Sequence, residues 1–153
     1  TNFMVDIGGE IVARGENPKK ELWRIGINKP VDDSLSINQE LQTVLNVTDV
    51  GIATSGNYRN FYIKDGKKYA HTIDPRTGYP AEQSVLSATI VANDCMTADA
   101  YATAFMAMGL EKARQMADSL PEIEYYVIYA DENGKHQIEY SKGMLQYLPK
   151  RKQ

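Results

Sequence analysis

Short runs of alternating apolar and polar residues fill most of the chain before residue 93, and they predict β-strands. The clearest run is 84–92, Ser-Val-Leu-Ser-Ala-Thr-Ile-Val-Ala, which is rich in β-branched residues. Turn-forming residues separate the runs, and the pair Asp65-Gly66 is typical of a hairpin. In chain order, strands are expected at 3–7, 10–14, 22–27, 41–47, 50–54, 60–64, 68–72 and 84–92.

The hydrophobic period then changes to that of helices. Residues 97–108 are rich in alanine and methionine and are followed by Gly109, a helix stop. A second run, 110–120, has one apolar face and ends before Pro121. Two more strands, 125–130 and 137–140, flank a turn at 131–134. The pattern therefore predicts one domain over 1–153 with an α+β fold, a mostly antiparallel sheet packed with two consecutive helices.

Composition and charge exclude several classes of protein. The 153 residues are 42% hydrophobic and 24% charged, as in globular proteins. A net charge of -3 leaves no electrostatic footprint for nucleic acid. No apolar run approaches the roughly 20 residues of a membrane-spanning helix. The single cysteine, Cys95, excludes an intrachain disulfide and is interpreted as a small buried residue.

The segment 71–80, His-Thr-Ile-Asp-Pro-Arg-Thr-Gly-Tyr-Pro, concentrates polar chemistry in one place. Pro75 fixes its own φ and keeps Asp74 out of the helical region, so the segment is expected to form a rigid loop. His71 is a candidate proton acceptor or an inert strand-end histidine. Asp74 could orient its ring, and Arg76 could hold a phosphate. His136, in a hairpin, is expected on the surface.

Two other groups of residues suggest a ligand site. Asp99 and Thr103 are four apart on the first expected helix, so they share a face, and their oxygens suit Mg²⁺. The alternative is that Asp99 serves the helix dipole in the first turn and Thr103 bonds its own backbone. The glycine turns at 8–10 and 54–58 either lay backbone N–H groups against a ligand or simply turn the chain.

Together these segments resemble one family. The chain carries Val-Asp-Ile-Gly-Gly-Glu-Ile at 5–11, Ala-Arg-Gly at 13–15 with Asn17-Pro18, Trp-Arg-Ile-Gly-Ile at 23–27, Thr-Ser-Gly-Asn-Tyr-Arg at 54–59, the histidine segment 71–80 and Ala-Asp-Ala-Tyr-Ala-Thr-Ala at 98–104. This order is similar to that of the ApbE family, the FAD:protein FMN transferases, formerly called thiamine biosynthesis lipoproteins. The resemblance implies a T-fold-like ApbE architecture.

The resemblance also implies an activity and roles for residues. Family members use Mg²⁺ to transfer FMN from FAD to a threonine hydroxyl of a target flavoprotein, and AMP is released. By analogy Asp99 and Thr103 would hold Mg²⁺, and His71 would accept the threonine proton. The expected FAD-binding residues are Gly8, Gly9, Glu10, Ser55, Gly56, Tyr58, Arg76 and Thr77, although Arg76 and Thr77 could instead brace their loop. Rival functions are an FAD pyrophosphatase giving FMN and AMP, a non-enzymatic FAD-binding module and an inactive structural fragment.

The position of the motifs within the chain adds one expectation. In the family, the Asp-Ile-Gly-Gly segment lies near the middle, after a lipobox cysteine, a third metal ligand from a backbone carbonyl and part of the flavin site. The chain is therefore expected to be the C-terminal part of the catalytic domain, with a fold incomplete at its N-terminus. A homodimer is expected as a way to cover the exposed sheet. The full-length protein is expected on the periplasmic side of a bacterial cell envelope, lipid-anchored to the membrane.

Overall fold

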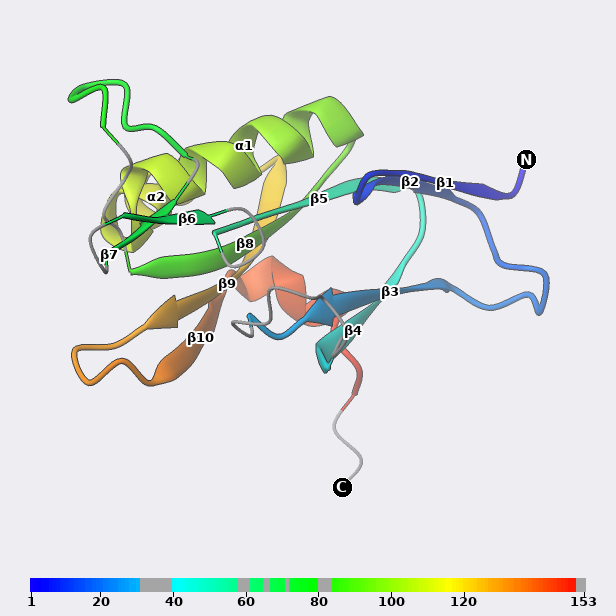
Figure 1. Ribbon diagram of the computed structural model, residues 1–153. Coiled ribbons are helices and arrows are strands. Elements are labelled where there is room, and N and C mark those ends of the chain that lie inside the picture. Colours follow the sequence, from blue (N-terminus) through cyan, green and yellow to red (C-terminus); the bar gives the residue numbers. More distant parts are fainter. Residues whose placement is uncertain (31–39, 58–60, 65–66, 71, 80–83, 151–153) are drawn as a thin grey trace.

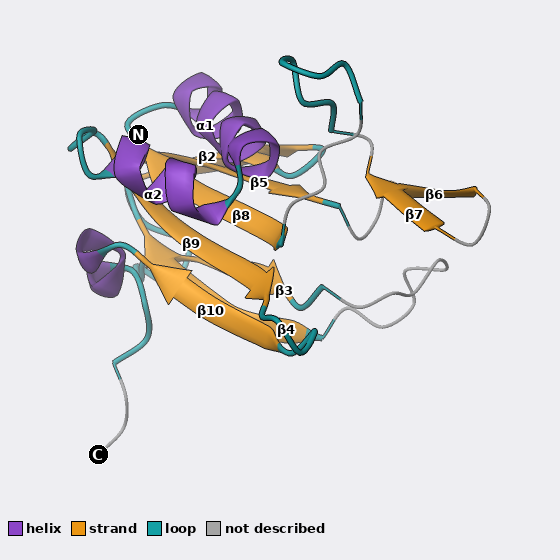
Figure 2. Cartoon of the chain, turned by 90° about the vertical axis from the view of Figure 1, so that its left-hand side faces the viewer, coloured by secondary structure: helices purple, strands orange, loops and turns teal. Residues whose placement is uncertain are grey.

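The computed structural model describes residues 1–30, 40–57, 61–64, 67–70, 72–79 and 84–150. Its main feature is a six-stranded antiparallel sheet in the order β1-β2-β5-β8-β9-β10 (Figure 1). These strands are β1 (Phe3–Ile7), β2 (Glu10–Arg14), β5 (Val50–Gly56), β8 (Val85–Ala92), β9 (Ile123–Ala130) and β10 (His136–Tyr140). Two hairpins, β3 (Trp23–Asn28) with β4 (Leu41–Val47) and β6 (Phe61–Lys64) with β7 (Lys67–Ala70), form separate two-stranded sheets (Figure 2).

The two expected helices are present with different ends. Helix α1 (Cys95–Met108) begins earlier than expected because Asp94 caps it, accepting the Thr97 N–H at 2.8 Å. Gly109, at φ 79°, separates it from α2 (Leu110–Ala117). After α2 the chain tightens into a turn, in which Leu120 N–H donates to the Ala117 carbonyl. A short 3-10 helix, η1 (Lys142–Gln146), was not predicted.

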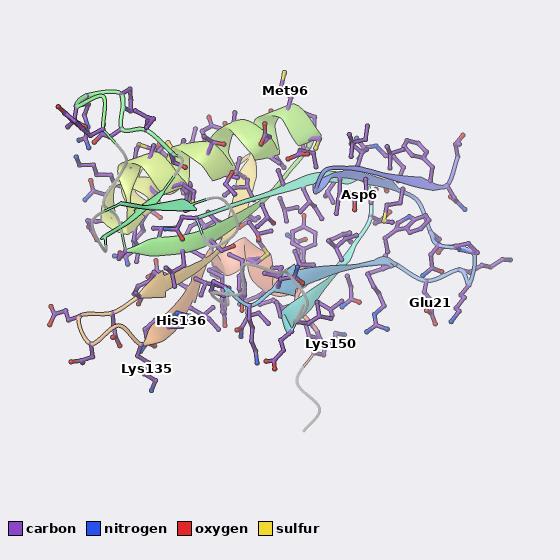
Figure 3. All side chains as sticks on the ribbon, viewed as in Figure 1. Asp6, Glu21, Met96, Lys135, His136 and Lys150 are labelled. Atoms are coloured by element: carbon purple, nitrogen blue, oxygen red, sulfur yellow. The ribbon has the colours of Figure 1, made fainter. Side chains whose placement is uncertain are left out.

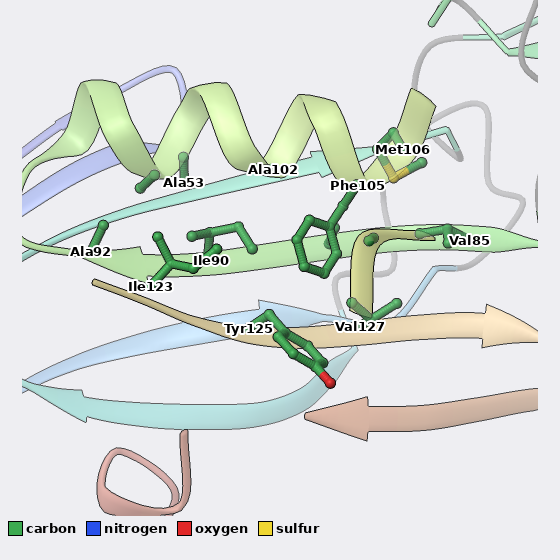
Figure 4. Packing of buried hydrophobic residues seen from close by; sticks show 13 residues of the cluster. Ala53, Val85, Ile90, Ala92, Ala102, Phe105, Met106, Ile123, Tyr125 and Val127 are labelled. Atoms are coloured by element: carbon green, nitrogen blue, oxygen red, sulfur yellow. The ribbon is translucent and has the colours of Figure 1, made fainter. Parts of the chain in front are cut away.

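The central strands of the six-stranded sheet are covered on both faces. Helix α1 buries Phe105 and Met106 against one face, where Phe105 also meets the Tyr125 ring at 5.3 Å between centroids (Figure 4). The β3–β4 hairpin and η1 cover the other face with Ile25, Leu45 and Met144. Because side chains alternate along a strand, Ile90 of β8 faces the helix cluster and Val91 faces the hairpin cluster. The strongest sequence pattern, 84–92, is thus a strand buried on both faces.

Gly51 brings α1 unusually close to β5. A Cβ atom at this position would lie 2.2 Å from the Asp94 carbonyl carbon and 2.3 Å from the Cys95 nitrogen. Real Cβ atoms do not approach backbone this closely, so only glycine allows the first turn of α1 to rest on the strand. The contact sets the height of the helix above the sheet.

Strand β1 lies at the edge of the sheet and is exposed along its whole length. Four of its residues are large and apolar: Phe3, Met4, Val5 and Ile7, the last with 72% of its surface exposed. His136 is also exposed, as predicted (Figure 3). Across the described part of the chain, neither helix has the length and apolar character needed to cross a bilayer.

Candidate functional site

A cleft of about 640 Å³ opens where the β1–β2 turn, β3, β5 and α1 meet. The turn contributes Asp6, Gly8, Gly9 and Glu10, β5 contributes Thr54, Ser55 and Gly56, and α1 contributes Asp99 and Thr103. Residues 25–28 of β3 also line the cleft. The structure therefore gathers seven of the predicted site residues, which come from three separate segments: Gly8, Gly9, Glu10, Ser55, Gly56, Asp99 and Thr103.

The β1–β2 turn owes its shape to its two glycines. Gly8 and Gly9 have φ angles of 71° and 104°, in the left-handed region that favours glycine. Gly9 N–H donates to Asp6 Oδ1 at 3.0 Å and closes the turn. A Cβ atom on Gly8 would lie 3.1 Å from Glu10 Oε2. The turn consequently brings main chain, rather than bulky side chains, to the cleft wall.

Helix α1 presents Asp99 and Thr103 to the cleft. The preceding residues, Ala98 and Ala102, are fully buried against the sheet, while Asp99 and Thr103 are exposed. The Thr103 hydroxyl lies 3.2 Å from the Ser55 hydroxyl, which links the helix to β5. The interpretation that Asp99 serves the dipole of the first helical turn is wrong, because the helix starts at Cys95 and has no acidic residue in that turn.

The charged groups at the cleft share one sign. Among the described residues that line it, Asp6, Glu10 and Asp99 are acidic and none is lysine or arginine. A pyrophosphate would be repelled by these carboxylates unless a cation accompanied it. The Asp99 carboxylate and the Thr103 hydroxyl are hard oxygen ligands, one helical turn apart, of the kind that Mg²⁺ takes. The donor set fits a metal that also binds water and phosphate.

The Asp-Pro loop is closed around Asp74, whose surface is only 7% exposed. Arg76 binds this carboxylate through Nε at 3.0 Å and Nη2 at 2.6 Å, and its backbone N–H donates at 2.9 Å. These hydrogen bonds lower the pKa of Asp74 to about 2. The N–H groups of Thr77 and Gly78 donate to the Asp74 carbonyl. The expected tight loop is present over 72–79.

Two predicted site residues, Arg76 and Thr77, are not among the described residues that line the cleft. The Arg76 guanidinium is engaged by Asp74, and Thr77 Oγ1 accepts the Tyr79 N–H at 3.2 Å, so both brace the loop. Their contact with FAD stays a prediction. His71 and Tyr58 lie outside the described residues, and their proposed roles are carried by the sequence alone.

Sequence reasoning missed several lining residues. Asp6 and Thr54 lie inside segments that had been recognised, yet neither was assigned a role. Thr54 pairs with Thr89 of β8, hydroxyl to hydroxyl at 2.8 Å, across the sheet. Residues of β3 were missed because no local pattern shows how a separate hairpin packs against the sheet.

Cys95 is half-buried, with Sγ 3.6 Å from the Ile52 carbonyl oxygen, and burial raises the pKa of its thiol.

Comparison with known proteins identifies the family and the fold of this chain. The ApbE family model matches residues 1–127. A FAD:protein FMN transferase from Vibrio cholerae is 45% identical over 118 residues, covering 77% of this chain and 34% of that protein. One from Haemophilus influenzae is 38% identical over 133 residues, covering 87% of this chain and 37% of that protein.

Solved structures agree with these relatives. The flavin transferase ApbE from Vibrio cholerae superimposes with a TM-score of 0.78 at 37% identity, over 96% of this chain and 44% of that one. The ApbE protein from Thermotoga maritima superimposes with a TM-score of 0.80 at 30% identity, over 97% of this chain and 45% of that one. The chain belongs to the ApbE family. It spans about a third of the length of the curated relatives it matches.

Proposed function

We propose that the protein transfers FMN from FAD to a threonine hydroxyl of a target flavoprotein, with Mg²⁺, and releases AMP. The observation that carries this proposal is the position of Asp99 and Thr103 on α1, at a cleft whose charged lining residues are all acidic. The proposal is supported by the family, since the relatives from Vibrio cholerae and Haemophilus influenzae are FAD:protein FMN transferases.

Each group at the cleft has a role in this reaction. Asp99 and Thr103 would hold Mg²⁺, which when bound neutralises charge on the pyrophosphate oxygens. The open main chain at Gly8 and Gly9 would lie along the dinucleotide. Asp6 holds the glycine turn in shape through its bond to the Gly9 N–H.

The transfer step exchanges one bond to phosphorus for another. The acceptor threonine oxygen forms a bond to the phosphorus of the FMN half of FAD. The bond between that phosphorus and the bridging oxygen breaks, and AMP leaves with the bridging oxygen. His71 would take the threonine proton, since imidazole titrates near neutral pH.

Hydrolysis of FAD is the rival reaction at the same groups. Water in place of threonine would give free FMN and AMP. Product analysis with and without an acceptor protein separates the two reactions. The transferase requires that FMN become covalently attached to the acceptor, and the pyrophosphatase requires only free FMN in both assays.

The metal-binding assignment is tested with Asp99→Ala in the complete protein. We expect FMN transfer to fall by several powers of ten, because each factor of ten corresponds to only about 1.4 kcal/mol of transition-state stabilisation. Circular dichroism should show an unchanged fold, since Asp99 is exposed. Asp118→Ala, an exposed carboxylate at the end of α2, is the matched control and should keep full activity. Full activity of Asp99→Ala at ordinary Mg²⁺ would falsify the assignment.

The cellular location is proposed on the family resemblance. The full-length protein would be lipid-anchored on the periplasmic side of the bacterial envelope, where its acceptor flavoprotein would also be exposed. Cell fractionation followed by immunoblotting tests this location. Recovery of the full-length protein in the cytoplasmic fraction would contradict it.

A further inference from the structure

Strand β5 has one edge that is only partly paired. On one side β8 pairs with it from Gly51 to Gly56. On the other side β2 pairs only with Val50–Ile52, because β2 begins at Glu10, directly after the glycine turn. Within the described ranges of the chain, no strand pairs with 54–56 on this second side. The same three residues line the cleft.

The direction of the backbone groups on this edge follows from one hydrogen bond. Asn57 N–H donates to the Leu86 carbonyl at 3.1 Å, so the backbone of residue 57 points toward β8. In antiparallel strands the hydrogen-bonding groups of successive residues point to alternate edges. The N–H and C=O groups of Ser55 therefore also point toward β8, whereas those of Thr54 and Gly56 point to the unpaired side of β5. An edge of this kind recruits extended polypeptide.

We propose that the 54–56 edge of β5 binds an extended segment of the acceptor protein by strand addition. This inference rests on the proposed function and states how the acceptor is held. Ser55 Oγ lies 3.2 Å from Thr103 Oγ1, so a strand added here runs beside the residues assigned to the metal. A hydroxyl side chain on that strand is thereby delivered to the place where the pyrophosphate would bind.

The charge of the cleft favours a particular acceptor segment. Asp6, Glu10 and Asp99 line the same cavity as the open edge. Lysine or arginine residues flanking the acceptor threonine would be attracted to these carboxylates. Main-chain hydrogen bonds would hold any extended acceptor segment, and the flanking positive charges would favour some acceptor sequences over others.

The test probe is the peptide Lys-Val-Ala-Thr-Ala-Val-Lys added to the isotope-labelled chain. Amide hydrogen exchange measured by NMR should slow at Thr54 and Gly56 when the peptide binds. Gly56→Pro removes one outward N–H at a position where an edge strand tolerates proline. Peptide affinity should fall about tenfold, the effect of about one lost hydrogen bond. Gly56→Ala keeps the N–H and should bind the peptide within about twofold of the unaltered chain.

A second measurement covers the case in which Gly56→Pro does not fold. A peptide N-methylated on alternate residues, so that it cannot donate to the edge, should lose binding to the unaltered chain. Equal binding of the methylated and unmethylated peptides would overturn the proposal. So would protection of the Thr54 and Gly56 amides by FAD and Mg²⁺ alone and not by the peptide, since the edge would then belong to the nucleotide.

Failure of the proposed function gives a different result. In that case the peptide protects the two amides, but no FMN becomes attached to it in the complete protein. If the docking inference alone fails, the peptide does not slow exchange at Thr54 and Gly56, although the unaltered complete protein still attaches FMN to acceptor protein. The two outcomes are separated by measuring exchange and transfer in parallel.

Discussion

At the scale of single residues, the paired side chains of Asp74 and Arg76 make the loop over 72–79 sensitive to acid. A carboxyl whose pKa is lowered by folding contributes stability above its unfolded pKa and loses it as the pH falls through the folded value. With an unfolded pKa near 3.9 and a folded pKa of about 2, the contribution of Asp74 is lost between about pH 4 and pH 2. The loop is therefore fully braced at neutral pH.

Arg76→Met tests this pairing. Without the guanidinium, the pKa of the Asp74 carboxyl should rise from about 2 toward its ordinary value. Carbon-detected NMR titration of the Asp74 side chain measures the change. Arg24→Met, at an exposed position on β3, removes the same charge elsewhere and should leave the pKa of Asp74 in place. An unchanged pKa in Arg76→Met would show that backbone donors alone hold the carboxylate ionised.

His71→Ala tests the proposed base. FAD affinity should be retained while FMN transfer falls by roughly 10²–10⁴-fold, the usual contribution of a positioned proton acceptor. Affinity and transfer are measured side by side in the complete protein. His136→Ala, at an exposed position on β10, is the control and should affect neither quantity. A collapse of affinity with normal turnover of bound FAD would make His71 a binding residue.

At the scale of elements, the contact between Gly51 and the first turn of α1 sets the position of the helix face that carries Asp99 and Thr103, the proposed metal ligands. Gly51→Ala should lift the helix, because the new methyl group would meet backbone atoms of Asp94 and Cys95. We expect a loss of about 1–3 kcal/mol in unfolding free energy, the usual cost of overpacking, and weaker Mg²⁺ binding. Chemical denaturation and a Mg²⁺ titration measure the two effects.

Gly26→Ala is the matched control for this prediction. Its added methyl group would meet only the side chain of Leu41, which is exposed and can move. Stability should therefore change by less than in Gly51→Ala. Equal losses in the two variants would show that the Gly51 contact has no special role in seating α1.

Helices and strands could be predicted from the sequence where neighbouring residues alone set their pattern. The strands at 3–7, 10–14 and 41–47 are confirmed residue for residue, because alternation and turn residues fix them. The start of α1 was misplaced because the capping role of Asp94 depends on a hydrogen bond to Thr97 that spacing alone does not show. The packing of β3 against the cleft also escaped prediction, since it joins segments that share no sequence pattern.

The residues of the candidate site also fall into those that a local sequence pattern predicts and those that depend on tertiary packing. Asp99 and Thr103 were predictable as a pair because helical spacing places them on one face. Their meeting with Ser55 depends on the packing of α1 over β5, which the sequence does not encode locally. Arg76 and Asp74 are close in the sequence, yet their pairing was not predicted, because the positive charge of Arg76 suits a phosphate ligand equally well.

At the scale of the whole molecule, the exposed apolar strand β1 predicts self-association. An edge strand with free backbone groups and apolar side chains pairs readily with another copy. The chain should form dimers, and Val5→Lys with Ile7→Lys should make it monomeric, because charged side chains disfavour edge pairing. Analytical ultracentrifugation gives the mass. Leu145→Lys, exposed on η1, is the control and should remain dimeric; a monomeric unaltered chain would contradict the prediction.

The affinity for FAD also depends on the whole molecule. The cleft is formed by elements of this chain, whereas the matched solved structure from Vibrio cholerae has more than half of its length outside the matched region, with 44% covered. The chain should therefore bind FAD more weakly than the complete protein. Fluorescence titration of both proteins measures the difference, and equal affinities would show that this chain supplies all the contacts.

The only cysteine of the chain offers a chemical reporter for one of these contacts. Cys95 lies in the first turn of α1, with its thiol against the Ile52 carbonyl of β5 and its nitrogen beside Gly51. Because its pKa is raised, little thiolate forms near neutral pH and alkylation is slow while the helix is seated. The rate of alkylation then measures how often α1 leaves the strand, and ligands that bind Asp99 and Thr103 should slow the labelling.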